Sequence, residues 1–557
     1  MPVKSSNKIL SQTVTQLCLL KKIDHIVISP GSRNAPLTIG FTENKSFTCF
    51  SIIDERSAAF FALGLAQQLQ KPVALVCTSG SALLNYYPAI AEAFYSDIPL
   101  VILSADRPKE RIDIGDGQTI RQENVFHNHI LYSANCKEGP AFKIYNETEI
   151  NKALNKAILE KGPVHINIPF SEPLYKTGDT LQASPLTIEP EFSEATIDIT
   201  QLKPFVDIWN TSKRKLVLVG VLKPNSIEQK YLDFLAADSS VVVLTETTSN
   251  LHHKNFFPCI DQLIASLDSE GFNALQPDVL LTFGGMVVSK KIKSFLRNYA
   301  PKYHWHIDEK KAYDTYFVLS RHFKVSANNF LSQFLKNVKN NNSDYKPYWS
   351  AIKLHRLKQH NAYLDIIPFC DFKVFDAILP AIPDNYLVHI SNSSAIRYTQ
   401  LFELNKSLQI YCNRGTSGID GCTSTAIGAS YISSTPTVLI TGDLSFLYDS
   451  NGLWNNYIKN TFRIILINNG GGGIFRILPG DKNTNNFDTY FETRHNLNAK
   501  YLSEMYGFEY ASVNKEDDLN KALKLFYNLS EKPKLLEIFT PTKMNDKTLL
   551  DYFNFIK

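Results

Sequence analysis

The stretch Thr441–Phe475, with the apolar run that leads into it, constrains the fold more than any other part of the chain. Two apolar runs, Thr437–Thr441 and Arg463–Ile467, flank a polar, helix-compatible segment at Asp449–Lys459. Short continuous apolar runs rich in β-branched residues are typical of strands that are covered on both faces. The pattern therefore predicts a strand–helix–strand unit in an open, parallel sheet.

Polar residues follow both of these predicted strands. Gly442-Asp443 ends the first, and Asn468-Asn469 with four successive glycines ends the second. Ligands of open α/β sheets bind outside the carboxyl ends of the strands. Carboxylate and amide oxygens suit Mg²⁺, and glycines let the backbone approach a bulky anion. The stretch predicts a site for a metal-bound anion, although an ordinary βαβ unit with a glycine-rich loop is the alternative.

Strand-like runs at α/β spacing recur along the whole chain of 557 residues. They fall into three blocks, 1–180, 200–340 and 349–557, joined by polar, turn-rich linkers. The predicted class is α/β, with three doubly wound domains and mainly parallel sheets. The runs are Asp24–Ser29, Ser51–Asp54, Val73–Thr78, Leu100–Ser104, Val164–Pro169, Lys215–Val221, Val241–Thr245, Val279–Phe283, Tyr303–Ile307, Tyr386–Ile390, Leu408–Cys412 and Lys534–Thr540.

Composition excludes several other classes of protein. The net charge is only +4 and no basic run marks a nucleic-acid partner. No apolar run approaches the length that spans a bilayer, and the N-terminus lacks the apolar core of a signal peptide. The eight cysteines are scattered, which argues against a CxxC metal site or a disulfide framework. We expect a cytoplasmic protein with reduced thiols and no membrane partner.

Glu55 is the most informative single residue. It begins a helix of small apolar residues, 55–69, that directly follows a predicted strand. A Glu in a first helical turn is often only a residue favoured by the helix dipole, worth ~0.3–1 kcal/mol. A mostly buried helix would instead leave this carboxyl in a desolvated position, where its pKa rises.

Several motifs together resemble those of thiamine-diphosphate (ThDP) enzymes, and specifically the 2-succinyl-5-enolpyruvyl-6-hydroxy-3-cyclohexene-1-carboxylate (SEPHCHC) synthases of menaquinone biosynthesis. They occur in order in the first and third blocks, and the middle block fits by length and position. The motifs are SPGSRNAPL at 29–37, IDERSAAFFALGLA at 53–66, SADRP at 104–108, NRGTSGIDG at 413–421, GDLSF at 442–446 and NNGGGGIF at 468–475. The resemblance implies a pyruvate-decarboxylase-like architecture with a pyrimidine-binding first block, a central block and a diphosphate-binding third block.

The resemblance also implies how the cofactor is held. Glu55 would be the catalytic residue, hydrogen-bonded to the aminopyrimidine ring so that the cofactor's own amine removes the thiazolium proton. Asp443, Asn469 and the carbonyl of Gly471 would bind Mg²⁺ or Mn²⁺ on the diphosphate. Gly442 and Leu444 flank the metal ligand, and Leu444 departs from the glycine common in the family. Ile419 would support the bend of the cofactor, or else is a plain core residue.

The implied substrates are 2-oxoglutarate and isochorismate, both dicarboxylates. Arginine binds carboxylates through two parallel hydrogen bonds, so cations after strand ends are the candidates. The middle block has Lys-Lys where the family tends to have Lys-Arg, and two apolar residues after the glycines would wall the intermediate. The candidates are Ser32, Arg33, Arg107, Gln118, Lys290, Lys291, Ser393, Arg397, Arg414, Ile474 and Phe475.

Glu55 and Asp443 lie in different blocks, yet one cofactor must touch both. The family solves this across a subunit interface, so the resemblance implies a dimer or a dimer of dimers. Two rival functions stay open. One is a generic ThDP-dependent 2-keto acid decarboxylase or acetolactate-synthase-like carboligase. The other is a catalytically dead protein of this fold that only binds partners, which retention of Glu55, Asp443 and Asn469 disfavours.

Overall fold

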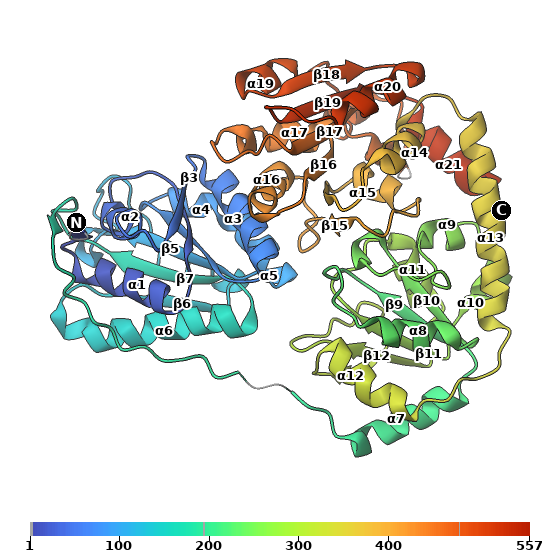
Figure 1. The fold of residues 1–557 in the computed structure, drawn as a ribbon, viewed down its shortest axis with the longest axis horizontal. Helices are drawn as coiled ribbons and strands as arrows, with labels where there is room; N and C mark the ends of the chain where they lie inside the picture. Colours follow the sequence, from blue (N-terminus) through green and yellow to red (C-terminus); the bar gives the residue numbers. More distant parts are fainter. Residues whose placement is uncertain (1–3, 193–194, 478–479) are drawn as a thin grey trace.

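The computed structural model describes residues 4–192, 195–477 and 480–557. Three parallel sheets form three α/β domains, which Figure 1 shows in blue to cyan, in green, and in orange to red. Every strand pairing inside these sheets is parallel, which confirms the predicted fold class. Buried Val, Ile and Leu fill the strands because helices cover both faces.

The first domain has a sheet of six strands. Their order is β3 (Thr48–Ser51), β2 (His25–Ile28), β4 (Val73–Cys77), β5 (Leu100–Asp106), β7 (Val164–Pro169) and β6 (Tyr132–Asn135). The α-helices are α1 (Ile9–Leu20), α2 (Ala35–Thr42), α3 (Glu55–Leu69), α4 (Ala82–Asn85), α5 (Tyr87–Ser96) and α6 (Lys143–Glu160). The 3₁₀ turns are η1 (Lys109–Arg111), η2 (His127–His129) and η3 (Pro140–Phe142), and β1 (Ser5–Ser6) pairs antiparallel with β8 (Thr177–Gly178).

The central domain has five strands. Their order is β10 (Val241–Thr245), β9 (Lys215–Val219), β11 (Val279–Phe283), β12 (Tyr303–Ile307) and β13 (Leu319–Phe323). The helices are α7 (Ile199–Thr211), α8 (Gln229–Ala237), η4 (Thr247–Ser249), α9 (Ile260–Ile264), α10 (Ser269–Leu275), α11 (Lys290–Asn298), α12 (Ala327–Phe334) and η5 (Leu335–Asn337).

The third domain has six strands. Their order is β15 (Gln409–Tyr411), β14 (Leu387–Ile390), β16 (Thr437–Gly442), β17 (Phe462–Asn468), β19 (Lys534–Phe539) and β18 (Glu509–Val513). The helices are α13 (Tyr345–Ile366), α14 (Asp371–Ala381), α15 (Ser394–Thr399), α16 (Cys422–Ile432), α17 (Asp443–Tyr448), η6 (Ser450–Leu453), η7 (Gly473–Ile477), α18 (Asn485–Tyr490), α19 (Lys500–Met505), α20 (Glu516–Phe526) and α21 (Asn545–Phe555).

Helices α3 and α16 join the first and third domains through a close crossing, near the middle of Figure 1. A Cβ on Gly64 would lie 2.1 Å from the carbonyl oxygen of Thr425, and one on Gly428 would lie 2.1 Å from that of Phe61. Only glycine allows the two backbones to approach so closely. One continuous hydrophobic core therefore runs from the first sheet into the third.

Two local predictions were wrong. The strand expected at Ser51–Asp54 lies earlier, as β3 (Thr48–Ser51), because Asp54 instead caps helix α3 by accepting a hydrogen bond from the Ser57 amide. The helix expected at Asp449–Lys459 also lies earlier, as α17 (Asp443–Tyr448) with the 3₁₀ turn η6. Asp443 therefore sits in the first turn of a helix and not in a loop.

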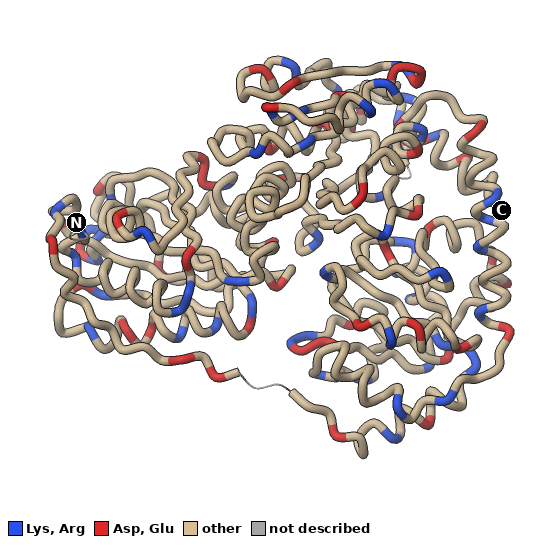
Figure 2. Tube along the Cα trace, in the orientation of Figure 1, with Lys and Arg blue, Asp and Glu red and all other residues tan. Residues whose placement is uncertain are grey.

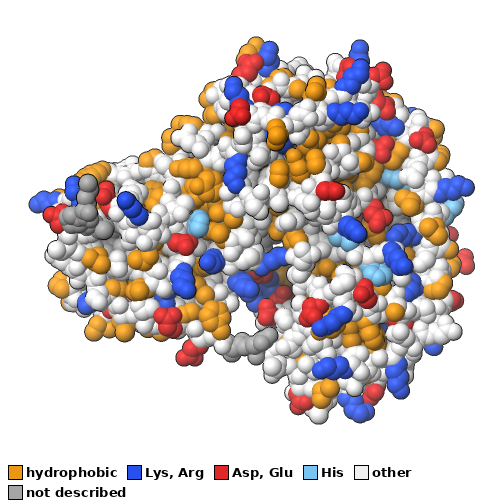
Figure 3. Space-filling view, in the orientation of Figure 1, with side chains coloured by type: hydrophobic (Ala, Val, Ile, Leu, Met, Phe, Trp, Pro, Cys, Tyr) orange, Lys and Arg blue, Asp and Glu red, His pale blue; other side chains and the backbone are white. Residues whose placement is uncertain are grey.

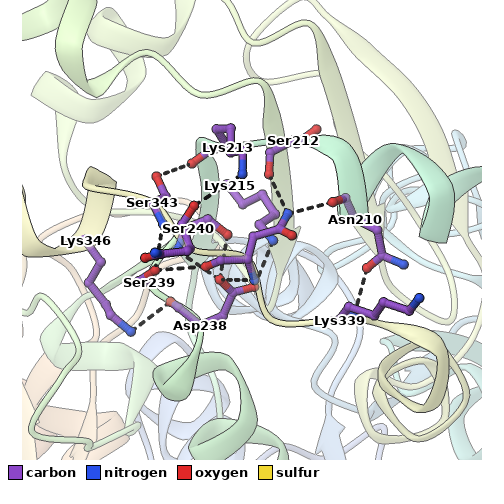
Figure 4. Close-up of polar contacts among 12 residues, drawn as sticks. Asn210, Ser212, Lys213, Lys215, Asp238, Ser239, Ser240, Lys339, Ser343 and Lys346 are labelled. Atoms are coloured by element: carbon purple, nitrogen blue, oxygen red, sulfur yellow. Dashed lines mark hydrogen bonds and ion pairs between the residues drawn. The ribbon is translucent and has the colours of Figure 1, made fainter.

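The segment between the central and third domains is held by a polar cluster at the amino ends of β9 and β10 (Figure 4). Lys215 and Asp238 form a fully buried ion pair of 2.8 Å. Asp238 also accepts from the amide of Asn341, and Lys346 donates to the Asp238 carbonyl. The next helix, α13, runs along the right edge of Figure 1 and packs Tyr345 and Trp349 into the core of the central domain.

Charges of both signs are interspersed along all three domains (Figure 2). Among the described residues, no helix is both long enough and apolar enough to cross a membrane.

Candidate functional site

The ends of β16 and β17 bring Asp443 and Asn469 to one edge of the third sheet. The two strands pair in parallel, with Gly442 opposite Ile467, which confirms that they are neighbours. Asp443 is buried, and its Oδ2 accepts hydrogen bonds from the amides of Gly470 (2.9 Å) and Gly471 (3.0 Å). The carboxylate therefore ties the end of one strand to the glycine loop of the next.

Asn469 presents an unpaired oxygen at this edge. Its Nδ2 donates to Asp371 Oδ2 at 2.8 Å, while its Oδ1 is buried and has no hydrogen-bond partner. Leaving a buried acceptor unpaired is costly, so such an atom points to a ligand. Burial raises the pKa of Asp371 to about 6, and Thr540 also donates to this carboxylate.

Two glycines shape the backbone around these groups, one closely packed and one facing open space. Gly471 has a φ of +151°, and a Cβ there would lie 2.6 Å from the Glu492 carbonyl oxygen. A Cβ on Gly442 would meet nothing within 4 Å. A buried carboxylate, an unpaired amide oxygen and open space beside them fit a divalent cation with a phosphate group. The Gly471 carbonyl, the third expected ligand, accepts a hydrogen bond from the Gly473 amide.

His495 is a residue of this site that the sequence argument missed. Its Nε2 lies 3.3 Å from Asp443 Oδ2, and this carboxylate raises the pKa of the imidazole. The His495 amide also donates to the Gly470 carbonyl. A histidine 26 residues beyond the Asn-Asn pair carries no local signal, because only tertiary packing brings it back to the strand end.

Glu55 begins α3 and is half-buried. Desolvation raises the pKa of its carboxyl, as the apolar helix led us to expect. The neighbouring Asp54 accepts a hydrogen bond from Asn451 Nδ2 at 2.7 Å, so the N-terminus of α3 lies against the segment after α17. Within the described part of this single chain, neither hydrogen bonds nor ion pairs link Glu55 to Asp443 or Asn469.

The candidate cations of the first domain lie together but are partly engaged. Arg33 is buried, and its Nη1 donates to the Phe170 carbonyl at 2.8 Å while its Nη2 lies 3.0 Å from a Glu172 carboxylate oxygen. Burial, and then the charge of Arg107, lower the pKa of Arg33, so the two guanidinium groups are neighbours. Arg107 donates to a backbone carbonyl of the loop that carries Gln118.

A second group of cations lies where the central and third domains meet. Arg414 Nη1 donates to Asn392 Oδ1 at 2.6 Å. Burial lowers the pKa of Arg397. The negative charge of Asp261 raises this pKa, and the positive charge of Arg414 lowers it. Lys291 places its ammonium group 4.7 Å from the centre of the Phe553 ring. The candidate substrate residues therefore form two groups. Among the described residues, no hydrogen bond or ion pair joins the cations of one group to those of the other.

The remaining candidates occupy loops and helix starts around these groups. Ser393 has a φ of +70°, an uncommon conformation that strains a residue with a Cβ. The Ile419 carbonyl accepts from Ser445 at 2.7 Å, which ties its loop to α17. Phe475 lies on η7 with 37% of its surface exposed. The others lie on the surface or half-buried, namely Ser32, Gln118, Lys290, Leu444 and Ile474.

Glu92 is a second residue that the sequence argument missed. It lies on α5 of the first domain and is 1% exposed, and no cation among the described residues forms an ion pair with it. Its carboxylate instead accepts from the amides of Gly415 (2.7 Å) and Thr416 (2.6 Å), directly after Arg414. Buried carboxylates need such donors, so Glu92 positions the loop that carries Arg414. An acidic residue inside an amphipathic helix carries no sequence signal for this role.

Comparison with known proteins identifies the family to which this architecture belongs. Three family profiles match in order, described as "Thiamine pyrophosphate enzyme, N-terminal TPP binding domain" at 10–131, "Middle domain of thiamine pyrophosphate" at 186–367 and "Thiamine pyrophosphate enzyme, C-terminal TPP binding domain" at 393–538. The SEPHCHC synthase of Christiangramia forsetii is 60% identical over 100% of both chains. The chain belongs to the SEPHCHC synthase family.

Less similar relatives support the same family assignment. The SEPHCHC synthase of Flavobacterium psychrophilum is 58% identical over 98% of both chains, and that of Porphyromonas gingivalis is 37% identical over 96% of this chain and 95% of its own. Benzoylformate decarboxylase from Polynucleobacter necessarius shares the fold, with a TM-score of 0.71 at 16% identity over 96% of this chain and 99% of its own. The SEPHCHC synthase family thus has the three-domain architecture of thiamine pyrophosphate enzymes.

Proposed function

We propose that this chain is a ThDP- and divalent-metal-dependent transferase that makes SEPHCHC in menaquinone biosynthesis. It would decarboxylate 2-oxoglutarate and join the remaining four-carbon unit to isochorismate, with release of CO₂. The observation that carries this proposal is the full-length identity of 60% to a SEPHCHC synthase, together with an unpaired Asn469 oxygen beside Asp443. We further propose a cytoplasmic homo-oligomer.

The first domain, 1–180, would bind the pyrimidine, and the third, 349–557, the diphosphate. Bound ThDP supplies a nucleophilic carbon and an electron sink. Asp443, Asn469 and the Gly471 carbonyl would hold Mg²⁺ or Mn²⁺, with Gly442 and Leu444 against the diphosphate. Ile419 would support the bend of the cofactor.

Glu55 would hold a proton at the pyrimidine, and its raised pKa supports that role, because proton sharing with a weak base is easiest when the pKa values are close. The two groups of cations would each receive one dicarboxylate. Arg33 and Arg107 form one group, and Arg397, Arg414 and Lys291 the other. Arg397 is desolvated, and a desolvated arginine is costly unless a carboxylate pairs with it, which disfavours a neutral substrate at that group.

Product analysis tests the proposal against its rivals. The holoenzyme is incubated with 2-oxoglutarate, with and without isochorismate, and parallel reactions contain pyruvate. We expect SEPHCHC only when both dicarboxylates are present, and poor use of pyruvate. Equal use of pyruvate would instead indicate a generic 2-keto acid decarboxylase or acetolactate-synthase-like enzyme. ThDP binding without any turnover would indicate a catalytically dead protein.

A further inference from the structure

The glycine loop that follows β17 is docked against a later segment of the third domain. The Glu492 carbonyl accepts a hydrogen bond from the Gly472 amide at 2.6 Å, and the Gly470 carbonyl accepts one from the His495 amide at 3.1 Å. A Cβ on Gly471 would lie 2.6 Å from the same Glu492 carbonyl oxygen. The later segment therefore holds the loop on both sides of Gly471, whose carbonyl is the third proposed metal ligand.

The side chain of Glu492 is fully buried and binds two cations. Nε and Nη2 of Arg476 donate to its two carboxylate oxygens, and Arg494 Nε donates to Oε2 at 2.6 Å. Asp488 lies 2.9 Å from Arg494 and 3.4 Å from Arg476, and Asp546 of α21 is a further acid near Arg476. Burial alone would raise the pKa of Glu492, but the hydrogen bonds and charges of the two arginines lower it below its ordinary value. Glu492 is therefore the charged centre of a buried cluster.

The turn that carries Glu492 has an uncommon backbone conformation. The next residue, Thr493, has a φ of +49°, which is rare for a β-branched residue. Its hydroxyl donates to the Glu492 carbonyl at 2.8 Å. Such conformations persist only where the surrounding contacts over-determine them. The turn allows one residue to contact the glycine loop with its carbonyl and Arg476 with its carboxylate.

Arg476 connects this cluster to the two apolar residues that are expected to enclose the reacting unit. It directly follows Ile474 and Phe475 on η7, and it is 6% exposed, whereas Phe475 is 37% exposed. Figure 3 shows that apolar side chains also lie on the surface of the third domain, at the top of the view. An apolar side chain that stays exposed gains little stabilisation from burial. The position of Phe475 therefore depends on the buried arginine next to it.

We propose that Glu492 is a positioning residue that determines whether the four-carbon unit is joined to isochorismate or protonated by water. Its carbonyl places the Gly471 carbonyl for the metal, and its carboxylate, through Arg476, places Ile474 and Phe475. This inference rests on the proposed function. Where the enclosure is loose, water reaches the four-carbon unit first. 2-Oxoglutarate then loses CO₂, gains one proton and leaves as succinate semialdehyde.

The ratio of the two products tests the link through Arg476. Each enzyme is incubated with ThDP, Mg²⁺, 2-oxoglutarate and isochorismate, and SEPHCHC and succinate semialdehyde are both quantified. Glu492→Gln and Arg476→Gln should each lower the ratio of SEPHCHC to succinate semialdehyde by about 10–100-fold, because small displacements of positioning groups have effects of this size. Arg476→Lys should give a ratio between those of Arg476→Gln and the parent, because it keeps the charge without the bidentate geometry.

A Mg²⁺ titration of ThDP binding by calorimetry, without substrates, tests the link through the Glu492 carbonyl. Glu492→Gln should lower the affinity for Mg²⁺ by about tenfold, because the clamp that holds its backbone is lost. Arg476→Gln should bind Mg²⁺ like the parent, since Arg494 still pairs with Glu492. A parent that makes no SEPHCHC would refute the proposed function, whereas this titration would still decide the role of Glu492 at Gly471.

The matched control is Glu504→Gln, which removes an exposed carboxylate from α19 of the same domain and should match the parent in both measurements. Thermal melting of every variant checks its fold, and Arg476→Gln decides the product ratio if Glu492→Gln does not fold. A parent-like product ratio in Arg476→Gln, or a parent-like Mg²⁺ affinity in folded Glu492→Gln, would overturn the inference. Equal losses of Mg²⁺ affinity in the two variants would also overturn it, because the cluster would then act only as one structural unit.

Discussion

A side-chain amide can present either its oxygen or its nitrogen to a ligand. At Asn469, the hydrogen bond to Asp371 determines which of the two atoms is free. An ionised carboxylate only accepts hydrogen bonds. Asp371 therefore engages Nδ2 of Asn469 and leaves Oδ1 free for a cation. Asp371 is 98 residues away in the sequence and acts as a positioning residue for the proposed metal ligand. Partners of this kind tune metal sites strongly.

Asp371→Asn should lower the affinity for Mg²⁺ by about 10–100-fold, because the new amide can donate to Asn469 and turn its oxygen away. The measurement is a Mg²⁺ titration of ThDP binding by calorimetry, with circular dichroism to check the fold. Asp376→Asn, on the exposed side of the same helix, is the matched control. Parent-like Mg²⁺ affinity in Asp371→Asn would contradict the positioning role.

Glu55→Gln should fold and bind ThDP normally but lose about 10²–10⁴-fold in turnover, because a carboxamide cannot exchange the proton. Calorimetry measures ThDP binding, and product formation measures turnover. Gln67→Glu, on the same helix, controls for a change of charge on α3. Near-parent turnover in Glu55→Gln would exclude the catalytic role.

At the scale of elements, the joints between domains depend on buried polar contacts as much as on apolar packing. The pair Lys215–Asp238 holds the start of β9 against the segment that leads to α13 (Figure 4). Both side chains are almost fully buried, at 0% and 2% exposure. Removing one partner leaves the other charge buried without a counter-charge, in a protein interior that solvates it poorly.

Asp238→Ala should therefore lower the free energy of unfolding of the central domain by about 3–5 kcal/mol. Urea unfolding followed by the fluorescence of the buried Trp209 and Trp305 measures this. Asp207→Ala is the matched control, since it breaks the exposed pair with Lys203 on α7, a change worth about 0–1 kcal/mol. Equal effects of the two variants would show that burial does not strengthen the central pair.

At the scale of the whole molecule, one chain holds Glu55 and Asp443 on domains joined through α3 and α16. No hydrogen bond or ion pair among the described residues links the two side chains. We expect the complete site to form between two chains. Chains with Glu55→Gln and chains with Asp443→Ala are then inactive alone but complement each other. A dimer with one of each has one site in which both residues are intact.

Co-expression with two affinity tags yields this mixed dimer, and it should show about half of the parent activity per dimer. The two homodimers are the controls. If each site forms within a single chain, every site of the mixed dimer lacks one residue and the mixture stays inactive. Light scattering of the parent distinguishes a dimer from a dimer of dimers.

The sequence by itself determined the three parallel sheets and the meeting of Asp443 and Asn469 at one sheet edge. Those features follow from local patterns, namely apolar runs, strand spacing and the turn residues after each strand. The pattern misplaced β3 and the helix after the first strand of the unit. Asp54 caps α3 through one hydrogen bond instead of extending the strand, and α17 begins directly at Asp443.

Only the tertiary structure decided which polar groups are free. Asp371, Glu92 and His495 come from distant segments, and no local pattern distinguishes them from ordinary core or surface residues. Arg33 looked like an open cation, yet Glu172 and a backbone carbonyl engage it. The physical reason is that periodicity depends only on neighbours along the chain. Whether a buried charge or amide finds a hydrogen-bond partner depends instead on the groups that long-range packing places beside it.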